Sequence, residues 1–447
     1  MTIAPPTPAP SLADGMVRRI YANLAKLMGG KAIAGIISLI YMVLAIRALG
    51  ARDYGVLILV HAYTITVGGL IEFPGWHAVV RYGAQATRAG DSDRLIRLLR
   101  LAGIVELVSG ALAFAVAALL APLIGARLGW TPTAIAFSTP YSLAVLATIR
   151  STPAGLLQLL GRFDVLGMHN LIAPTVRLAG ALIAIATGSG LHGFLIAWLA
   201  AALAEGGAMW ALGWMMARRT LSGRKLLGSA RGAIPENPGI RRFMLAANAD
   251  ATFGELSHRI APLMVGWILG PTGAGLYAVG LRATTAIAQP AGNLGQAAYA
   301  ELARLVAAGG RGSELRHVVI RSILIAFAVG LPFLLLVALF GESLAVLIGG
   351  KDFQAAGMVM LWLVAARVVL LVAPSTSAAL IALGRPGNSV TANAICSLGL
   401  LPLLPILIEH YGLAGAGFHA LISSFAVALA LGTLAWRASN QVGPART

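Results

Sequence analysis

The sequence predicts an all-α membrane protein with many spans, and three observations lead to that class. Hydrophobic residues make up 58% of the 447 residues and charged residues only 11%, whereas soluble domains average about 45–50% and about 25%. Charge-free runs of about 20 residues, the length that crosses a bilayer as a helix, recur along the chain. These runs are apolar on every side and rich in Leu, Ala and Gly, which excludes the alternating pattern of a membrane β-barrel.

Hydropathy, helix breakers and charges together predict about twelve transmembrane helices. We place them at 27–48, 55–80, 101–124, 133–158, 169–187, 193–217, 244–269, 274–300, 319–341, 354–383, 389–408 and 414–436. Ten or eleven spans are the alternative, because the segment 169–187 is short and the segment 354–383 is long.

The positive charges predict the orientation of these spans. With the N-terminus inside, 23 of the 33 Lys and Arg residues fall in inside segments, and only four, Arg47, Arg52, Arg127 and Lys351, fall outside. Because cytoplasmic loops collect Lys and Arg, both termini are predicted to be cytoplasmic. The net charge of +17 is explained by this topology, so we expect no nucleic-acid partner.

Two short motifs recur at nearly one offset. The turn from Leu49 to Gly55 resembles the turn from Leu269 to Gly275, 220 residues later, and Leu160-Gly161-Arg162 is echoed by Leu383-Gly384-Arg385, 223 residues later. Matches at equivalent places predict a duplicated chain, as in many transporters. The predicted parts are an N-terminal tail (1–26), a six-helix lobe (27–217), a basic linker (218–243), a second six-helix lobe (244–436) and a C-terminal tail (437–447).

The chain also resembles a known family at three segments: Ala45 to Gly55, Gly155 to Phe163 and Gly270 to Tyr277. At these residues it is similar to the polysaccharide transporters, or O-antigen-type lipid-linked oligosaccharide flippases, of the multidrug/oligosaccharidyl-lipid/polysaccharide (MOP) exporter superfamily. The resemblance implies two lobes around a central cavity that opens alternately to either side of a bacterial inner membrane.

The cargo that this resemblance implies is an oligosaccharide on undecaprenyl pyrophosphate, exported for the assembly of surface polysaccharide. The partners expected with it are the lipid-linked oligosaccharide itself, the phospholipid bilayer and a polysaccharide polymerase complex.

Ionisable residues inside the spans are the candidate site. Each costs at least about 2.5–3.5 kcal/mol at membrane depth and therefore needs a partner or a watery cavity. Basic residues outnumber acidic ones there, which suits an anionic cargo, and the arginine fork suits phosphate. The candidate substrate-binding residues are Arg259, Arg282, Arg177, Arg367, Arg150 and Lys31. For Lys31 and Arg150 the alternative is that they reach the nearer membrane interface.

Four residues are candidates for binding a coupling ion: Asp250, Glu255, His258 and Glu72. His61 is a further proton-binding candidate, and a structural hydrogen bond is the alternative for each. Glu255 and Arg259 are spaced to form an ion pair on one helix face, which in the simplest interpretation only lets that helix insert. Glu106 is predicted to lie at the inside interface, and we propose no role for it.

The sequence carries no signature of an enzyme. Cys396 is the only cysteine, which excludes intramolecular disulfides and cysteine-based zinc sites. No nucleophile elbow, phosphate loop or metal-ligand cluster is visible, so we expect no catalytic residue, metal or cofactor. The alternatives are a drug or cation exporter, which needs acids in excess in its cavity, and a membrane glycosyltransferase or polymerase, which needs long outside loops.

Overall fold

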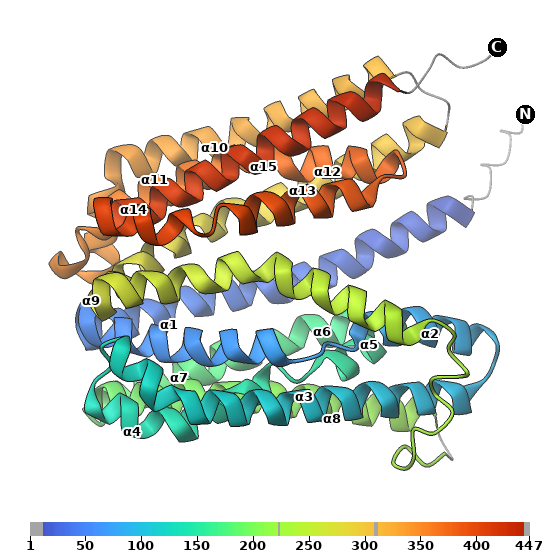
Figure 1. The fold of residues 1–447 in the computed structure, drawn as a ribbon, viewed down its shortest axis with the longest axis horizontal. Coiled ribbons are helices and arrows are strands. Elements are labelled where there is room, and N and C mark those ends of the chain that lie inside the picture. The colour runs from blue at the N-terminus through green and yellow to red at the C-terminus, as the bar shows by residue number, and fades with distance from the viewer. Residues whose placement is uncertain (1–11, 222–223, 308–311, 442–447) are drawn as a thin grey trace, which may run out of the picture.

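The computed structural model describes residues 12–221, 224–307 and 312–441, and every regular element within these ranges is a helix (Figure 1). The N-terminal lobe consists of α1 (Leu12–Ile71), α2 (Trp76–Arg88), α3 (Ser92–Arg127), α4 (Pro132–Tyr141), the 3₁₀ helix η1 (Ser142–Ala147), α5 (Ser151–Leu159), α6 (Phe163–His169), α7 (Ile172–Ala186) and α8 (Gly190–Thr220).

The C-terminal lobe consists of α9 (Ile240–Ala307), α10 (Gly312–Gly349), the 3₁₀ helix η2 (Lys351–Phe353), α11 (Ala356–Val369), α12 (Val372–Ala382), α13 (Pro386–Gly399), α14 (Leu403–Tyr411) and α15 (Leu413–Asn440). The first half of α9 packs against α1 and joins the two lobes.

The predicted fold class is confirmed. Among the described residues, nine helices are long and apolar enough to cross a membrane, and α13 with α14, bent by 45°, forms a tenth span. Two of these nine helices each contain two membrane crossings, because α1 is broken at Gly50 and α9 is broken at Gly270. Counting both sides of each break gives the predicted twelve crossings.

The outer surface of the helices is apolar, as a lipid solvent requires. Leu119, Leu339 and Leu429 on α3, α10 and α15 are 80%, 71% and 70% exposed. Soluble monomers rarely expose large apolar patches. The exposed leucines therefore mark the lipid face, and the polar groups are left for the interior.

The breaks in the chain recur at the offset seen in the sequence. Among the described residues, four glycines with positive φ in the N-terminal lobe each have a counterpart 220–223 residues later. The pairs are Gly50 and Gly270, Gly129 and Gly350, Gly161 and Gly384, and Gly190 and Gly412. Gly50 and Gly270 have nearly the same backbone angles, φ 70° and 73° with ψ 179° and −177°, a conformation essentially reserved for glycine.

The two lobes touch at the end of the molecule where these first breaks lie. A side chain on Gly55 would overlap the carbonyl oxygen of Pro271, and one on Gly275 would overlap that of Ala51. The lobes spread apart toward the other end, where α1 starts and α15 finishes (Figure 1). This arrangement is a V whose closed end is fixed by glycine-to-backbone contacts.

Candidate functional site

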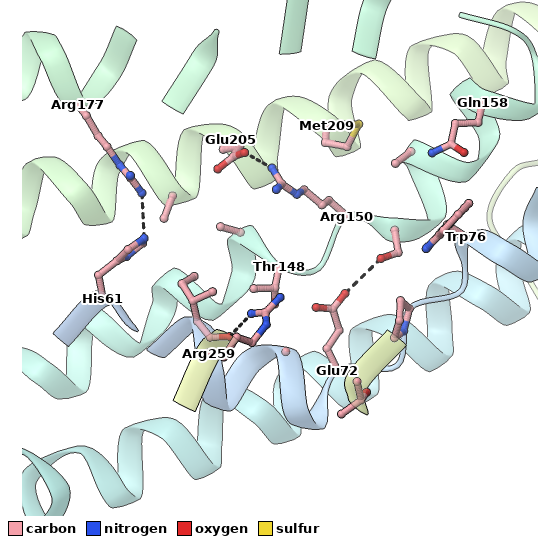
Figure 2. A pocket seen from close by; sticks show the side chains of 18 residues that line it. His61, Glu72, Trp76, Thr148, Arg150, Gln158, Arg177, Glu205, Met209 and Arg259 are labelled. Atoms are coloured by element: carbon pink, nitrogen blue, oxygen red, sulfur yellow. Dashed lines mark hydrogen bonds and ion pairs between the residues drawn. The ribbon is translucent and has the colours of Figure 1, made fainter. Parts of the chain in front are cut away.

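A cavity of about 530 Å³ lies between α1, the α5 region, α7, α8 and the first half of α9. Among the described side chains, five charged residues line its walls, which are Glu72, Arg150, Arg177, Glu205 and Arg259 (Figure 2). Most of the wall belongs to the N-terminal lobe, and α9 closes it with Thr252 and Arg259. Three of the predicted substrate-binding arginines, from three different spans, therefore share one cavity.

Arg177 is held in this cavity by neutral groups. Its guanidinium donates to Nε2 of His61 at 3.0 Å and to the hydroxyl of Tyr41 at 3.3 Å, and it lies 5.4 Å from the ring of Trp198. Because arginine only donates, Nε2 of His61 must accept, so the imidazole is neutral and its Nδ1–H donates to Tyr141 at 2.9 Å. No carboxylate pairs with Arg177 in the described part of the chain, so its charge stays uncompensated.

Arg150 is neutralised by contrast. It lies between η1 and α5, and its Nη1 forms an ion pair with Glu205 of α8 (Figure 2). The backbone carbonyl of Glu205 contacts Nε2 of His169 at 2.8 Å. The pair fixes the direction of the Arg150 side chain, and its charge is largely cancelled.

Arg259 reaches from α9 across to α1. Its Nη1 donates to the carbonyl of Ile65 at 3.0 Å, and its guanidinium lies against Gly69, where any side chain would overlap it. Arg259 thus connects the second lobe to the wall of a cavity built mainly by the first. The small residue at position 69 makes this approach possible.

Two buried acids shape the break between η1 and α5. Glu106 of α3 is fully buried and accepts from the backbone N–H groups of Ser151 and, at 2.7 Å, Thr152, the first two residues of α5. Glu72, 6% exposed, lies near the Ser151 hydroxyl at 3.4 Å. Trp210 donates to the carbonyl of Ile149 at 2.6 Å. These groups satisfy the backbone that the break frees, as a membrane interior requires.

The other predicted site residues lie elsewhere. Arg282 of α9 is not among the residues that line the cavity. Arg367 lines a separate cavity in the C-terminal lobe. Lys31 is exposed on α1. The side chains of Asp250, Glu255 and His258 lie outside the described residues, so the predicted Glu255–Arg259 pair stays a prediction.

Several residues that hold the site together could not be recognised from the sequence. Glu106 was placed at an interface, yet the structure buries it completely against α5. Tyr41, Tyr141 and Trp210 received no role, because each serves a partner 60 or more residues away. Among the described residues no group of three or more His, Cys, Asp or Glu residues could hold a metal ion.

The fold and its polar interior define a class, the multi-pass membrane proteins with the transporter fold of the MOP superfamily. An inward-facing MATE-family multidrug resistance transporter of that superfamily superposes with a TM-score of 0.72 at 15% identity, covering 91% of this chain and 95% of the other. The lipid II flippase MurJ, in an inward closed conformation, gives 0.71 at 11% identity, with 91% and 87% covered. The resemblance seen in the turn motifs is thereby confirmed.

The chain belongs to the polysaccharide biosynthesis protein family, whose model matches residues 98–358, more than half of its length. It is 28% identical over 345 residues to the inner membrane protein YghQ of Escherichia coli K12, covering 76% of this chain and 95% of that protein. A MOP transporter from Pyrococcus furiosus, in which reversed polarity of the binding pocket suggests a different function, superposes with a TM-score of 0.58 at 14% identity, covering 95% and 96%. Family and fold together support a transporter or flippase.

Proposed function

We propose that this protein is a flippase that moves an undecaprenyl-pyrophosphate-linked oligosaccharide across the bacterial inner membrane, for assembly of surface polysaccharide. The family, the transporter fold and the inner-membrane relative support this class of function. The cavity supports an anionic cargo, because three arginines and two acids line it among the described side chains. A drug or cation exporter would need the opposite balance.

The observation that carries the proposal is the environment of Arg177. A guanidinium held by His61, Tyr41 and Trp198 has its position fixed without losing its charge. A pyrophosphate entering the cavity exchanges its water shell for this guanidinium, which can bind two phosphate oxygens at once. Arg259 completes the contact from the second lobe, so that bound cargo bridges the two halves.

Transport then follows from alternating access. The V is open toward the end where α1 starts and α15 finishes, which is the cytoplasmic end if the positive-inside orientation holds. The headgroup enters there while the lipid tail stays in the bilayer. An inside-negative potential favours outward movement of an anion by about 2.3 kcal/mol per charge per 100 mV. Of the four residues predicted to bind a coupling ion, Glu72 has a described side chain that lines the cavity. A polysaccharide polymerase would take up the exported glycan.

The test is the rate of flipping in vesicles reconstituted with a fluorescent undecaprenyl-pyrophosphate oligosaccharide. Arg177→Gln should slow flipping by at least about tenfold, because hydrogen bonds to a charged group contribute about 1.5–3 kcal/mol. Arg177→Lys should slow it less, because it keeps the charge and loses the fork. The matched control is Arg127→Gln, at an exposed arginine at the end of α3. Equal rates in Arg177→Gln and Arg127→Gln would refute the proposal.

A further inference from the structure

The C-terminal lobe contains a second cavity, of about 420 Å³, that shares no lining residue with the first. It lies between α9, α11, α13 and α15. Its volume falls within the usual range for small-molecule sites, about 300–1,000 Å³. Neither Arg177 nor Arg259, the residues proposed to contact the pyrophosphate, lines this cavity.

Among the described residues that line this cavity, Arg367 of α11 alone carries a permanent charge. It lines the cavity together with the apolar side chains of Leu363 and Leu370, and it forms no hydrogen bond or ion pair with any described residue. A cation in a membrane-embedded lobe is costly unless it faces water or a partner. The cavity therefore offers a full positive charge to whatever enters it.

The neutral polar groups of the lining complement that charge. Asn393 of α13 accepts from Ser397 through its carbonyl oxygen at 3.4 Å, which leaves its NH₂ group for a ligand. Thr284 and Thr285 donate to carbonyls of their own helix, each at 2.7 Å, so their oxygens remain as acceptors. His419 contacts the carbonyl of Leu400 at 3.0 Å. The cavity thus combines hydrogen-bond donors that can bind an anion with acceptors that can bind hydroxyl groups.

We propose that this cavity binds an acidic sugar residue of the cargo glycan, with its carboxylate on Arg367 and Asn393 and its ring hydroxyls on Thr284 and Thr285. The inference rests on the proposed function and extends it, because it assigns the pyrophosphate and the glycan to different lobes. Arginine binds a carboxylate with two parallel hydrogen bonds, and buried Tyr277 supplies an aromatic wall. The positive charge of Arg367 would not be needed for a wholly neutral glycan.

A phosphate group would bind Arg367 through the same hydrogen bonds, so the experiment must distinguish the carboxylate of an acidic sugar from a phosphate. The probe is a glucuronic-acid disaccharide, whose binding to the purified full-length protein is followed by saturation-transfer NMR. Its methyl ester is the neutral comparison, and inorganic phosphate and glycerol phosphate are the competitors. We expect the acid to bind at least about tenfold more tightly than the ester. Neither phosphate should displace the acid at equal concentration.

The variants decide where the sugar binds. Arg367→Gln should abolish the preference for the acid, Arg367→Lys should keep part of it, and Arg177→Gln should leave it intact. Retained preference in Arg367→Gln, equal binding of acid and ester, or displacement by phosphate would each overturn the inference. Thermal unfolding of each variant shows that it is folded. Flipping of a cargo with a neutral glycan should depend on Arg177 and not on Arg367, so failure of this inference is distinguishable from failure of the proposed function.

Discussion

At the scale of single residues, the site depends on which charges are cancelled and which are not. Arg150 and Arg177 both line the first cavity, but Arg150 faces the carboxylate of Glu205, whereas Arg177 faces neutral His61 and Tyr41. The sequence shows only that both arginines lie within spans. The difference between them arises from helices far apart in the chain, and it makes Arg177 the better ligand for an anion.

Glu106 illustrates a residue whose role is positional. Glu106→Ala would leave the N–H groups of Ser151 and Thr152 buried without acceptors, at about 1–3 kcal/mol each. We expect it to lower the free energy of unfolding by about 2–4 kcal/mol, measured as a reduced denaturation midpoint in detergent. Glu409→Ala, at an exposed acid on α14, is the control and should change little. An unchanged midpoint in Glu106→Ala would show that water satisfies these groups.

At the scale of elements, the spans could be predicted from the sequence and several of their interruptions could not. Long apolar runs in a bilayer must be helices because no water satisfies the backbone, and this argument is local. The break between η1 and α5 is not local, because it depends on Glu106 from α3 and Trp210 from α8. The segment predicted as one helix at 55–80 is likewise interrupted after Ile71 and resumes at Trp76.

For the candidate site, the sequence likewise predicted the charged residues but neither their grouping into cavities nor their uncharged partners. Charge counting found Arg150, Arg177 and Arg259, which share a cavity, because any ion within a span is conspicuous. It could not tell that Arg367 lines a different cavity, because the grouping of helices into lobes decides this. Side chains without charge, such as Tyr41, gave no such signal.

The glycine contacts at the closed end of the V give a prediction for the elements that meet there. Gly55→Val would push α1 off the backbone of Pro271, which cannot rotate away, so the lobes should separate at this end. The measurement is crosslinking between cysteines at positions 47 and 347 in a Cys396→Ser background, because Arg47 donates to the carbonyl of Leu347 at 2.7 Å in the closed arrangement. We expect Gly55→Val to suppress the crosslink strongly.

Gly35→Val on the same helix is the matched control, since no atom lies within 4 Å of a side chain placed at position 35. It should crosslink as the parent does. If Gly55→Val crosslinks as efficiently as Gly35→Val, the contact with Pro271 does not hold the lobes together.

At the scale of the whole molecule, contacts with α2 and α3 hold the segment between α8 and α9 against the first lobe. Arg97 of α3 forms an ion pair with Glu236 at 2.8 Å, and Tyr82 of α2 donates to the carbonyl of Pro238 at 3.2 Å. Ile240, where α9 begins, is 1% exposed in a small core with Tyr82 and Leu98. The start of α9 is therefore held to the first lobe, so that in the proposed alternating access the bending takes place further along α9.

Arg100 of α3 makes several hydrogen bonds to the segment between α8 and α9. Its guanidinium donates to the backbone carbonyls of Lys225, Leu226, Leu227 and Ser229, and hydrogen bonds to a charged group contribute about 1.5–3 kcal/mol.

A loss of about 1.4 kcal/mol raises tenfold the population of molecules in which this segment is detached from the first lobe. The rate of proteolysis follows that population when detachment is fast. Trypsin should therefore cut Arg100→Ala at Lys225 about tenfold faster in detergent, whereas Arg88→Ala, at an exposed arginine on α2, should be cut at the parent rate. Equal rates in the two variants would mean that other contacts, such as those of Arg97 with Glu236 and of Tyr82 with Pro238, hold the segment, and that Arg100 adds nothing to the unit formed by the first lobe and the start of α9.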